Sequence, residues 1–325
     1  MFSNGWIMHI DDFVHTVSSE WMHRYGEKVH KLTLAAGFSC PNRDGTLGRG
    51  GCTFCNVKSF TDPTEHLSIR EQLNYGKANI GGRSKKYFAY FQSYTTTYAE
   101  VEYLRRLYDQ ALQEADIVGL CIGTRPDCLS RACLDLLLSY ADAGYEIIVE
   151  LGLQTANDQT LKRINRGHDF LSYYNTCRLA RSFGLDVCTH LIIGLPDEDL
   201  DDNMNTLSKV LDAGTTALKL HPLHVVRGSA MEKQYHAGRL GILTRDEYVE
   251  IAGELIANTP KDIVYHRVSA TARADQLVAP EYCIKRFPVI DAVANYLARY
   301  GAQGCAIGDF YEKNSYFAQR LNRNQ

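Results

Sequence analysis

Three cysteines near the start of the chain have the spacing of ligands for an inorganic cluster. Cys40, Cys52 and Cys55 follow the pattern C-x11-C-x2-C, and four glycines lie between the first two. Glycine accepts backbone conformations that let the main chain approach a bulky ligand closely. A fully ligated [4Fe–4S] cluster takes four cysteine thiolates, so a cluster held by these three would keep one iron open for another molecule.

A structural zinc site is the main alternative for the same cysteines. Zinc usually takes a fourth Cys or His ligand at a short interval, and the next histidine, His66, lies eleven residues beyond Cys55. The spacing therefore favours an open iron–sulfur cluster. The competing hypothesis is a zinc-binding α/β protein without enzymatic activity.

Composition narrows the class of protein further. The chain has 325 residues, is 45% hydrophobic and carries a formal net charge of −3. This length predicts one large domain or one domain with an appendage, and the charge gives no global basic field for nucleic acid. Ten cysteines in a chain of this length are too sparse for a disulfide scaffold and favour a reducing compartment.

Neither a signal peptide nor a membrane span is predicted. The first 21 residues contain acids and lack the apolar segment of a signal peptide, and no apolar run reaches the length of a membrane span. We therefore expect a cytoplasmic enzyme without a membrane partner.

Strands and helices alternate through most of the chain, and these elements must position the cysteines. The predicted strands are residues 29–34, 87–91, 117–122, 146–151, 186–193 and 217–220. The predicted helices between them are residues 100–114, 131–143, 170–183 and 200–213, preceded by a helix that the capping box Ser68-x-x-Glu71 opens. Such alternation specifies parallel βαβ units. Six units predict an α/β fold with a partial (β/α)6 TIM-like barrel, because a closed barrel needs eight.

The alternation loosens after residue 220, so we divide the chain into three parts. Residues 1–28 are an N-terminal extension, residues 29–240 the partial barrel, and residues 241–325 a C-terminal α/β extension or lid. The last part contains predicted helices at 244–258 and 289–300. Its predicted strand at 263–268 belongs either to a lid or to the barrel as a seventh element.

Polar residues end or follow each of the six predicted strands. The carboxyl ends of the strands carry the chemistry in parallel α/β barrels, so these residues predict a single polar pocket. Two of these residues also have a purely structural interpretation. Glu150 could form an ion pair with a nearby Lys or Arg, and His190 could be a hydrogen-bonded histidine of the core. In strand order the polar residues are Cys40; Gln92 and Ser93; Arg125; Glu150 and Gln154; His190; and Lys219, His221 and His224.

Several stretches of the chain resemble the radical S-adenosylmethionine (SAM) superfamily, and within it the YhcC/YtqA-like group. The commonest cluster motif of the superfamily is C-x3-C-x2-C, and the longer first spacer of this chain is similar to that of the elongator catalytic subunit. The resemblance extends over roughly residues 29–297. The stretches that carry it are residues 36–45, 50–56, 90–95, 122–127, 150–155 and 279–281.

The resemblance implies the cofactors and the residues that bind them. Cys40, Cys52 and Cys55 would ligate three irons of a [4Fe–4S] cluster, whose open iron would chelate the amino and carboxylate groups of SAM. Phe54 would pack near the adenine, and Gln92 would contact the methionine amino group. The complete set of implied SAM contacts is Phe54, Asn56, Gln92, Ser93, Glu150, Gln154, Arg166, His190, Ile192 and Gly194.

The resemblance also implies an activity and its partners. A one-electron donor such as flavodoxin or ferredoxin would reduce the cluster, and SAM would be cleaved to methionine and a 5′-deoxyadenosyl radical. Similarity to the elongator subunit suggests a tRNA wobble uridine as the substrate; the alternative substrate is a small metabolite or a protein. Phosphate contact with tRNA would need a local basic face, for which the sequence offers Arg43, Arg49, Lys58, Lys77, Arg83, Lys85 and Lys86.

Overall fold

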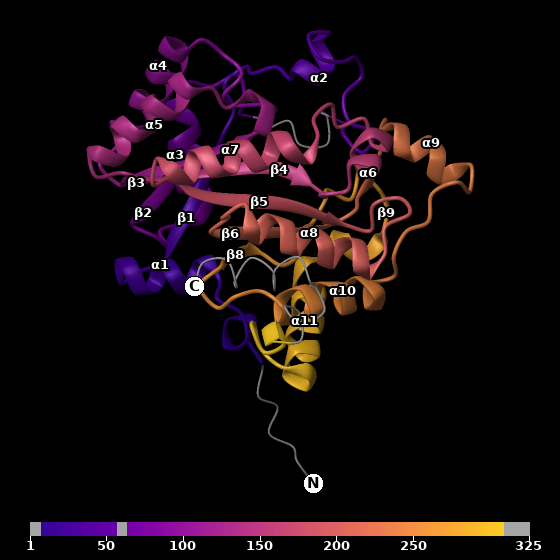
Figure 1. Cartoon of the computed structure of the whole chain (residues 1–325). Coiled ribbons are helices and arrows are strands. Elements are labelled where there is room, and N and C mark those ends of the chain that lie inside the picture. Colours follow the sequence, from indigo (N-terminus) through magenta and orange to yellow (C-terminus); the bar gives the residue numbers. More distant parts are fainter. Residues whose placement is uncertain (1–7, 57–63, 309–325) are drawn as a thin grey trace, which may run out of the picture.

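A parallel β-sheet forms the centre of the protein, and the computed structural model describes residues 8–56 and 64–308 of the chain (Figure 1). Within this range the sheet has seven strands in the order β1-β2-β3-β4-β5-β6-β8. It curls into a partial barrel, as the sequence predicts. The strands are β1 (Val29–Leu34), β2 (Lys86–Phe91), β3 (Ile117–Thr124), β4 (Glu146–Gln154), β5 (Asp186–Ile193), β6 (Ala217–Pro222) and β8 (Val264–Arg267).

Helices follow the strands and cover the outer face of the sheet (Figure 1). In α4, Leu104, Tyr108 and Ala111 recur at helical spacing and are fully buried, so one face of the helix packs inward. The covering helices are α3 (Ile69–Ile80), α4 (Val101–Leu112), α5 (Arg131–Asp142), α7 (Phe170–Ser182), α8 (Leu200–Asp212) and α10 (Arg245–Ala257).

The limits of α3 follow from local sequence, as predicted. The Ser68 hydroxyl accepts the backbone N–H of Glu71, and the Glu71 carboxylate accepts the backbone N–H of Ser68. This capping box satisfies two donors that the first turn would otherwise leave unpaired. The helix ends at Gly81, whose φ of 65° lies in the left-handed region that glycine adopts readily.

A small hydrophobic cluster fills the inner face of the sheet near the amino ends of its strands. Trp21 of α1 (Val17–Tyr25) stacks on Phe88 of β2, with ring centroids 4.5 Å apart. Cys121 and Cys188 belong to the same buried cluster, as small apolar side chains do. Helix α1 therefore closes the amino end of the barrel interior, and any ligand must enter from the carboxyl ends of the strands.

The seventh strand of the barrel comes from the C-terminal part of the chain. β8 pairs in parallel with β6, and Lys219 lies opposite Arg267 in the register. The sequence predicts six barrel strands and a further strand at 263–268 that belongs either to a lid or to the barrel as a seventh element; the structure shows the second. The crossover from β6 to β8 runs through β7 (Val225–Val226), α9 (Ala230–His236) and α10, so the simple alternation that marks the earlier units is lost.

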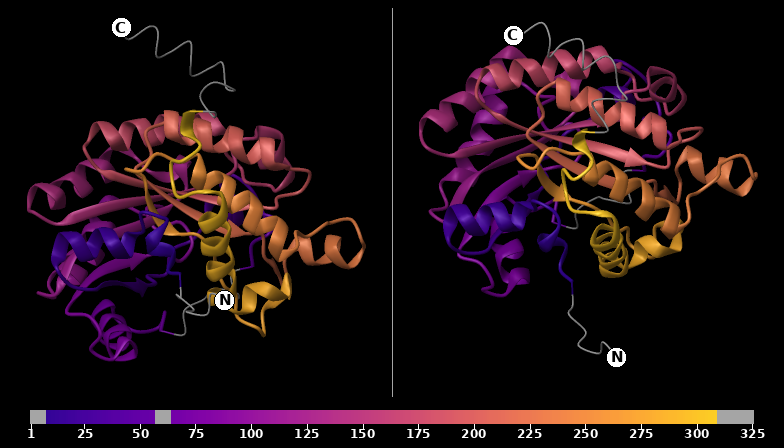
Figure 2. Two further views of the ribbon diagram at one scale, coloured as in Figure 1. Left: turned by 90° about the horizontal axis from the view of Figure 1, so that it is seen from below. Right: turned by 60° about the horizontal axis from the view of Figure 1, so that its bottom comes forward.

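The remaining elements pack around this framework (Figure 2). Helices α10 and α11 (Arg286–Tyr300) approach closely because Gly253 has no side chain: a Cβ there would lie 2.2 Å from the Tyr296 ring. Among the described residues, no helix has both the length and the apolar character needed to cross a membrane. The other elements are η1 (Ile10–Asp12), α2 (Pro41–Asp44), η3 (Pro126–Cys128), α6 (Asp158–Arg163), β9 (Leu277–Ala279), which pairs with β7, and η4 (Glu281–Ile284).

Candidate active site

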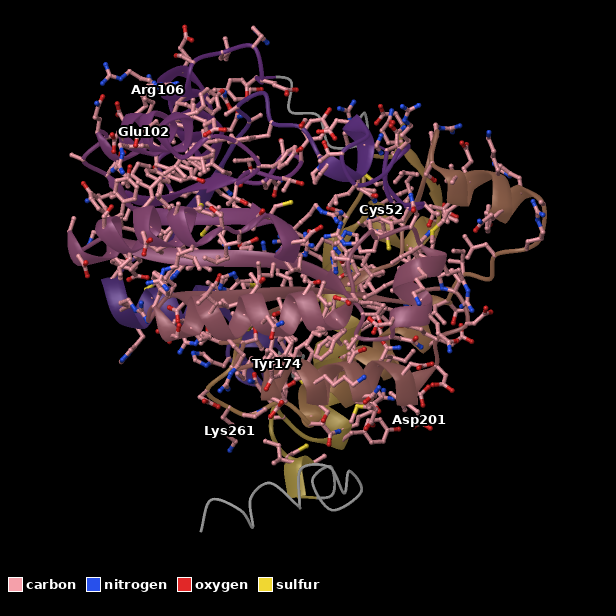
Figure 3. The ribbon with its side chains drawn as sticks, turned by 45° about the horizontal axis from the view of Figure 1, so that its top comes forward. Cys52, Glu102, Arg106, Tyr174, Asp201 and Lys261 are labelled. Atoms are coloured by element: carbon pink, nitrogen blue, oxygen red, sulfur yellow. The ribbon has the colours of Figure 1, made fainter. Side chains whose placement is uncertain are left out.

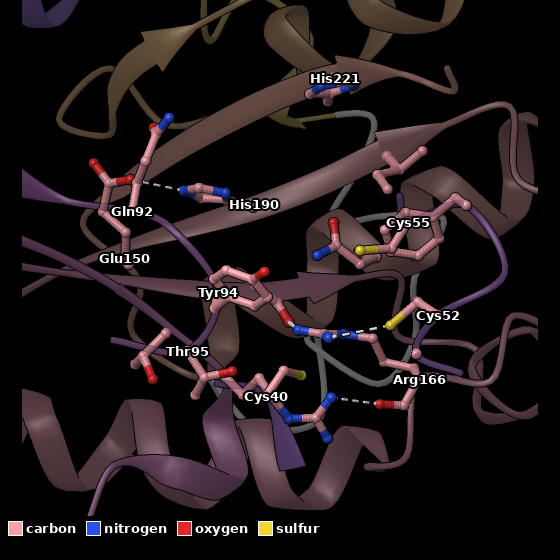
Figure 4. Close-up of a pocket in the computed structure, with 18 of the residues that line it drawn as sticks. Cys40, Cys52, Cys55, Gln92, Tyr94, Thr95, Glu150, Arg166, His190 and His221 are labelled. Atoms are coloured by element: carbon pink, nitrogen blue, oxygen red, sulfur yellow. Dashed lines mark hydrogen bonds and ion pairs between the residues drawn. The ribbon is translucent and has the colours of Figure 1, made fainter. Parts of the chain in front are cut away.

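A cavity of about 350 Å³ opens at the carboxyl ends of the strands (Figure 4). This volume lies in the usual range for a small-molecule site. Residues in or after each strand of the barrel reach it, which agrees with the predicted single polar pocket. Of the residues that the sequence singles out for cluster and SAM, those on its walls are Cys40, Cys52, Cys55, Phe54, Gln92, Ser93, Glu150, Gln154, Arg166, His190 and Ile192.

Two of the residues implied by the resemblance lie off the cavity walls. The Asn56 side chain donates a hydrogen bond to the backbone carbonyl of Arg227, on the segment that leads to α9. Gly194 follows β5 with a φ of 91°, and a Cβ there would contact Leu243. Their implied contact with SAM therefore has no support from the lining of this cavity.

The loop that carries the cysteines is folded tightly against the barrel. Cys40 is the N-cap residue of α2, and the Thr53 N–H donates to the Ile164 carbonyl at 2.9 Å, which fixes the loop beside the end of α6. Gly51 has a φ of 79°, and a Cβ there would lie 2.6 Å from the Arg43 side chain. Figure 3 turns this end of the barrel forward and shows Cys52 there.

Nitrogen donors surround the cysteine sulfurs. Arg43 Nη2 lies 3.3 Å from Cys55 Sγ, and Arg166 Nη1 lies 3.5 Å from Cys52 Sγ. Cationic donors stabilise thiolates, and hydrogen bonds to sulfur tune the potential of an iron–sulfur cluster. These contacts suit Cys52 and Cys55 as thiolates that bind a cluster.

The spacing of the sulfurs differs from that of a preformed zinc site. Zn–S bonds of about 2.3 Å place the sulfurs of a tetrahedral zinc site within roughly 4 Å of one another. Among the described residues, the only set of three potential ligand atoms within 4.8 Å of each other is Glu150, Cys188 and His190, so the three cysteines do not form such a set. In this structure the three cysteines therefore do not form a preassembled single-zinc site.

Arg125 and Arg166 form a second layer behind the cysteine loop. Arg125 is 2% exposed, and its guanidinium pairs with the Asp127 carboxylate at 2.7 Å. Its Nη1 donates to the Arg166 carbonyl, and Arg166 Nη2 in turn donates to the Gly152 carbonyl. Arg125, which the sequence places after the third strand, therefore holds the segment that presents Arg166 to Cys52.

Glu150 is the centre of a buried polar network inside the barrel. Its side chain is fully buried, and one carboxylate oxygen lies 2.6 Å from Lys31 Nζ. The other oxygen forms a salt bridge with Lys219 and accepts the Tyr90 hydroxyl at 2.6 Å. His190 Nε2 also lies 2.9 Å from this second oxygen (Figure 4). The structural alternative for Glu150, a buried ion pair, is what the structure shows.

The charges in this network are set by burial and by mutual contact. Burial raises the pKa of Glu150, but the charges of Lys219 and Lys31, together with hydrogen bonds to His190 and His266, outweigh burial and hold that pKa well below its usual value. Burial lowers the pKa of Lys219 to about 8 despite the nearby carboxylate. Burial likewise lowers the pKa of His190 to about 4 and that of His266 to about 3, so both rings are neutral at pH 7.

Sequence reasoning missed several members of this network. Lys31 and His266 lie inside predicted strands and carry no motif. Tyr90 begins the resembling stretch 90–95 but has no predicted role, and Lys219 is predicted only as a strand-end group. Period-two alternation along β1 and β2 marks which residues share a face of the sheet. It does not show that the two edge strands, β1 and β8, approach each other. That approach is visible in the 2.9 Å contact between Lys31 Nζ and His266 Nδ1.

The predicted basic face is wrong as a single surface near the cysteines. Arg43 and Arg49 lie in the cysteine loop, whereas Lys86 begins β2 at the opposite end of the barrel and pairs with Glu27. Lys77 is in the last turn of α3, which returns the chain to the amino ends of the strands, and it pairs with Asp116. Arg83 and Lys85 lie in the turn between α3 and β2, so they too are at the amino ends of the strands. Lys58 lies outside the described residues.

Comparisons with known proteins agree with this site. The family models for the radical SAM superfamily and the radical SAM C-terminal domain match residues 44–210 and 215–299. The chain is 54% identical over 302 residues to protein YhcC of Escherichia coli K12, covering 93% of this chain and 97% of that protein. It is 29% identical over 159 residues to a tRNA uridine(34) acetyltransferase of Dehalococcoides mccartyi, covering 48% of this chain and 33% of that protein.

The fold also has a solved counterpart. The archaeal Elp3 of Methanocaldococcus infernus superposes with a TM-score of 0.63 at 19% sequence identity, covering 89% of this chain and 68% of that one. Enzymes of the matched superfamily use a [4Fe–4S] cluster and SAM, and Cys40, Cys52 and Cys55 lie together on the walls of one cavity. The chain therefore belongs to the radical SAM superfamily of enzymes and is a relative of YhcC.

Proposed function

We propose that this radical SAM enzyme modifies the C5 side chain of the wobble uridine in tRNA. The observation that carries the proposal is the cysteine loop facing a cavity that polar groups from each barrel strand share. Similarity to a relative named for its action on tRNA uridine 34 supports RNA as the substrate. The chain spans only a third of that relative, so acetyl transfer is not part of the proposal.

We assign Cys40, Cys52 and Cys55 to the cluster, with Arg43 and Arg166 donating to their sulfurs. When bound, the cluster supplies one electron to SAM, whose cleavage gives a 5′-deoxyadenosyl radical able to take a hydrogen atom from an unactivated carbon. The protein supplies binding, orientation and exclusion of water. We assign the SAM contacts to the cavity residues Phe54, Gln92, Ser93, Gln154, Arg166 and Ile192.

Glu150 and His190 have a different role in this proposal. Both carboxylate oxygens of Glu150 are already occupied by Lys31, Lys219, Tyr90 and His190. We therefore assign Glu150 to positioning its neighbours at the floor of the cavity. His190 Nε2 faces Glu150, which leaves the opposite edge of its ring for a ligand.

A small metabolite or a protein segment is the second candidate substrate. The observation that favours it is the separation of the basic residues, because Lys77 and Lys86 lie at the amino end of the barrel and are paired with acids. Of the predicted face, Arg43 and Arg49 are the only members in the described part of the chain that flank the cysteines. An RNA bound at the cavity mouth would then have few basic side chains to contact its phosphate groups.

The remaining assignments concern the setting of the reaction. We propose that a one-electron donor such as flavodoxin or ferredoxin reduces the cluster, and that the enzyme works in the cytoplasm. We also propose that the part of the chain after residue 240 covers the barrel, since α10 and α11 pack beside it (Figure 2).

Mass spectrometry of tRNA nucleosides from a strain lacking the gene tests the substrate. We expect one modified uridine to be lost in the deletion strain, restored by the unmodified gene and not by a Cys55→Ser variant. Cys305 is exposed and lies away from the cavity, so Cys305→Ser is the matched control and should restore the nucleoside. An unchanged nucleoside profile would reject tRNA and favour the second candidate.

Binding of tRNA to the purified enzyme is the second test. A tRNA complex held by phosphate contacts weakens steeply as salt rises. We expect such salt-sensitive binding, with Arg49→Gln weakening it. Absence of tRNA binding at low salt would again favour a small metabolite or a protein.

A further inference from the structure

Arg267, the last residue of β8, is a cavity-lining cation without a counterion. Among the described residues it forms no ion pair, and its buried Nε atom has no hydrogen-bond partner. Arg267 as a whole is partly buried, and a guanidinium N–H that is shielded from water is normally paired, because leaving it unsatisfied is unfavourable. Arg267 therefore presents unused donors to the cavity.

Two imidazole rings lie on the same wall of the cavity. The rings of His221 and His224 meet edge to face, with centroids 4.3 Å apart. His224 is 9% exposed, and its buried Nε2 has no partner among the described residues. His221 Nδ1 lies 2.6 Å from the Pro222 carbonyl and must donate to it, which leaves Nε2 of a neutral ring as an acceptor.

Both rings are neutral at pH 7. Burial is the main cause that lowers the pKa of His224 to about 4, and the charge of Arg267 acts in the same direction. Burial also lowers the pKa of His221 well below its usual value, with His224 and Arg267 contributing. Arg267 is therefore the only charged group that this wall contributes within the described residues.

The charge balance of the barrel interior leaves Arg267 uncompensated. Lys31, Lys219 and Arg267 contribute positive charge there, and the neighbouring His190 and the ring of His266 are neutral. Glu150 is the carboxylate that faces them, and it is already bound by both lysines. A negatively charged ligand beside Arg267 would compensate the charge of this guanidinium.

Arg267 lies across the cavity from Arg166, the residue that contacts Cys52. Gly152, His190, Lys219 and Arg267 occupy one row of the sheet register on β4, β5, β6 and β8. With neighbouring strands about 4.8 Å apart, Arg267 is roughly 14 Å along the sheet from Gly152. The Gly152 carbonyl accepts Arg166, which also contacts Cys52, so the cysteine side and the Arg267 side are separate walls.

We propose that Arg267, flanked by His221 and His224, is an anion-binding subsite for the substrate. The substrate then carries a carboxylate or a phosphate group, with an N–H or O–H donor near it that an imidazole Nε2 accepts. A guanidinium binds either anion through paired N–H groups. The inference rests on the proposed function only in placing the substrate in the cavity that SAM shares, and it holds whether or not that substrate is tRNA.

Thermal unfolding of the cluster-loaded protein with small anions tests the subsite. The probes are sodium acetate, inorganic phosphate and, at equal ionic strength, sodium chloride. A ligand that binds only the folded protein raises its Tm with concentration. We expect acetate or phosphate to raise the Tm of the unmodified protein more than chloride does, and the more effective anion identifies the group that the substrate carries.

Variants separate this effect from general salt effects. Phosphate stabilises many proteins without a site, so the readout is the difference between variants. Arg267→Gln should weaken the binding of the anion at least about tenfold, or about 1.4 kcal/mol. Arg267→Lys should bind the anion more tightly than Arg267→Gln does, because it keeps the positive charge. Arg273 is exposed and pairs with Asp275, so Arg273→Gln is the matched control and should behave like the unmodified protein.

The inference is overturned if acetate and phosphate act no differently from chloride, or if Arg267→Gln responds as the unmodified protein does. A second measurement decides whether Arg267 binds the substrate or SAM. SAM binding shifts the EPR signal of the reduced cluster, and we expect this shift to be unchanged in the Arg267→Gln variant. Loss of that shift would assign Arg267 to SAM and overturn the substrate subsite. An unchanged tRNA profile in the deletion strain would reject the tRNA proposal alone.

Discussion

Glu150 on β4 and Lys219 on β6 form a salt bridge inside the barrel, although β5 lies between their strands. The contact exists because the sheet curls and inward-facing side chains from non-adjacent strands converge. Lys31 reaches the same carboxylate from β1, at the edge of the sheet. One acid thereby joins three strands at the floor of the cavity.

Glu150→Gln should destabilise the protein strongly. Removing one partner of a buried ion pair leaves the other charge uncompensated and costs about 3–5 kcal/mol. We expect a loss of this size in urea unfolding. The double variant Glu150→Gln with Lys219→Met should lose less than the two single changes added together, because the residues are in direct contact.

An exposed pair gives the comparison for that measurement. Arg131 and Asp135 pair on the surface of α5 and are both more than half exposed. Asp135→Asn should change the unfolding free energy by less than about 1 kcal/mol. If Glu150→Gln were as mild as this control, the network would not hold the barrel together.

Stability should fall in acid through His190. Its pKa is about 4 in the folded protein against a usual value of 6.5, mainly because the ring is buried. Between these two pH values the unfolded chain binds one more proton at this residue than the folded protein, so stability falls as pH falls. His190→Gln should reduce the slope of unfolding free energy with pH by up to about 1.4 kcal/mol per pH unit.

Urea unfolding at several pH values between 4 and 6.5 measures this slope. His236 lies at the end of α9 and is exposed, so His236→Gln is the control and should leave the slope as in the unmodified protein. Equal slopes for both variants would show that His190 does not change its protonation on folding.

Each cluster cysteine should be needed for iron. Cys40→Ser, Cys52→Ser and Cys55→Ser remove one of the thiolates on the cavity, and three are the minimum for a cubane with one open iron. We expect each variant to lose most of its iron, sulfide and visible absorbance after anaerobic reconstitution. Cys305→Ser should retain them, and full iron in any of the first three variants would contradict the assignment.

Arg166 should raise the reduction potential of the cluster. Its Nη1 donates to Cys52 Sγ, and a cationic donor near sulfur favours the more negative, reduced cluster. Arg166→Met should therefore shift the potential to more negative values in an EPR-monitored redox titration. Arg163 lies three residues earlier and pairs with exposed Asp197, so Arg163→Met is the control and should leave the potential unchanged.

Local sequence was sufficient for most of the helices and strands. The capping box at Ser68 and the apolar β-branched runs predicted α3, β1 and β5 closely, because caps and hydrophobic periodicity act over a few residues. The spacing of Cys40, Cys52 and Cys55 likewise indicated a cluster, since all three ligands lie on one loop. The rule that chemistry follows the strand ends then located the cavity.

Tertiary structure decided the contacts between residues far apart in the sequence. Lys31 meets Glu150 and His266 because the edges of a curled sheet approach each other, which no local pattern records. The same geometry placed Lys86 at the opposite end of the barrel from the cysteines. The sequence by itself predicted most of the elements and singled out the three cysteines that we assign to the cluster. Only the fold decided which charges are paired and that Arg267 faces the cavity without a partner among the residues that the structure describes, because the pairing of buried charges depends on three-dimensional proximity.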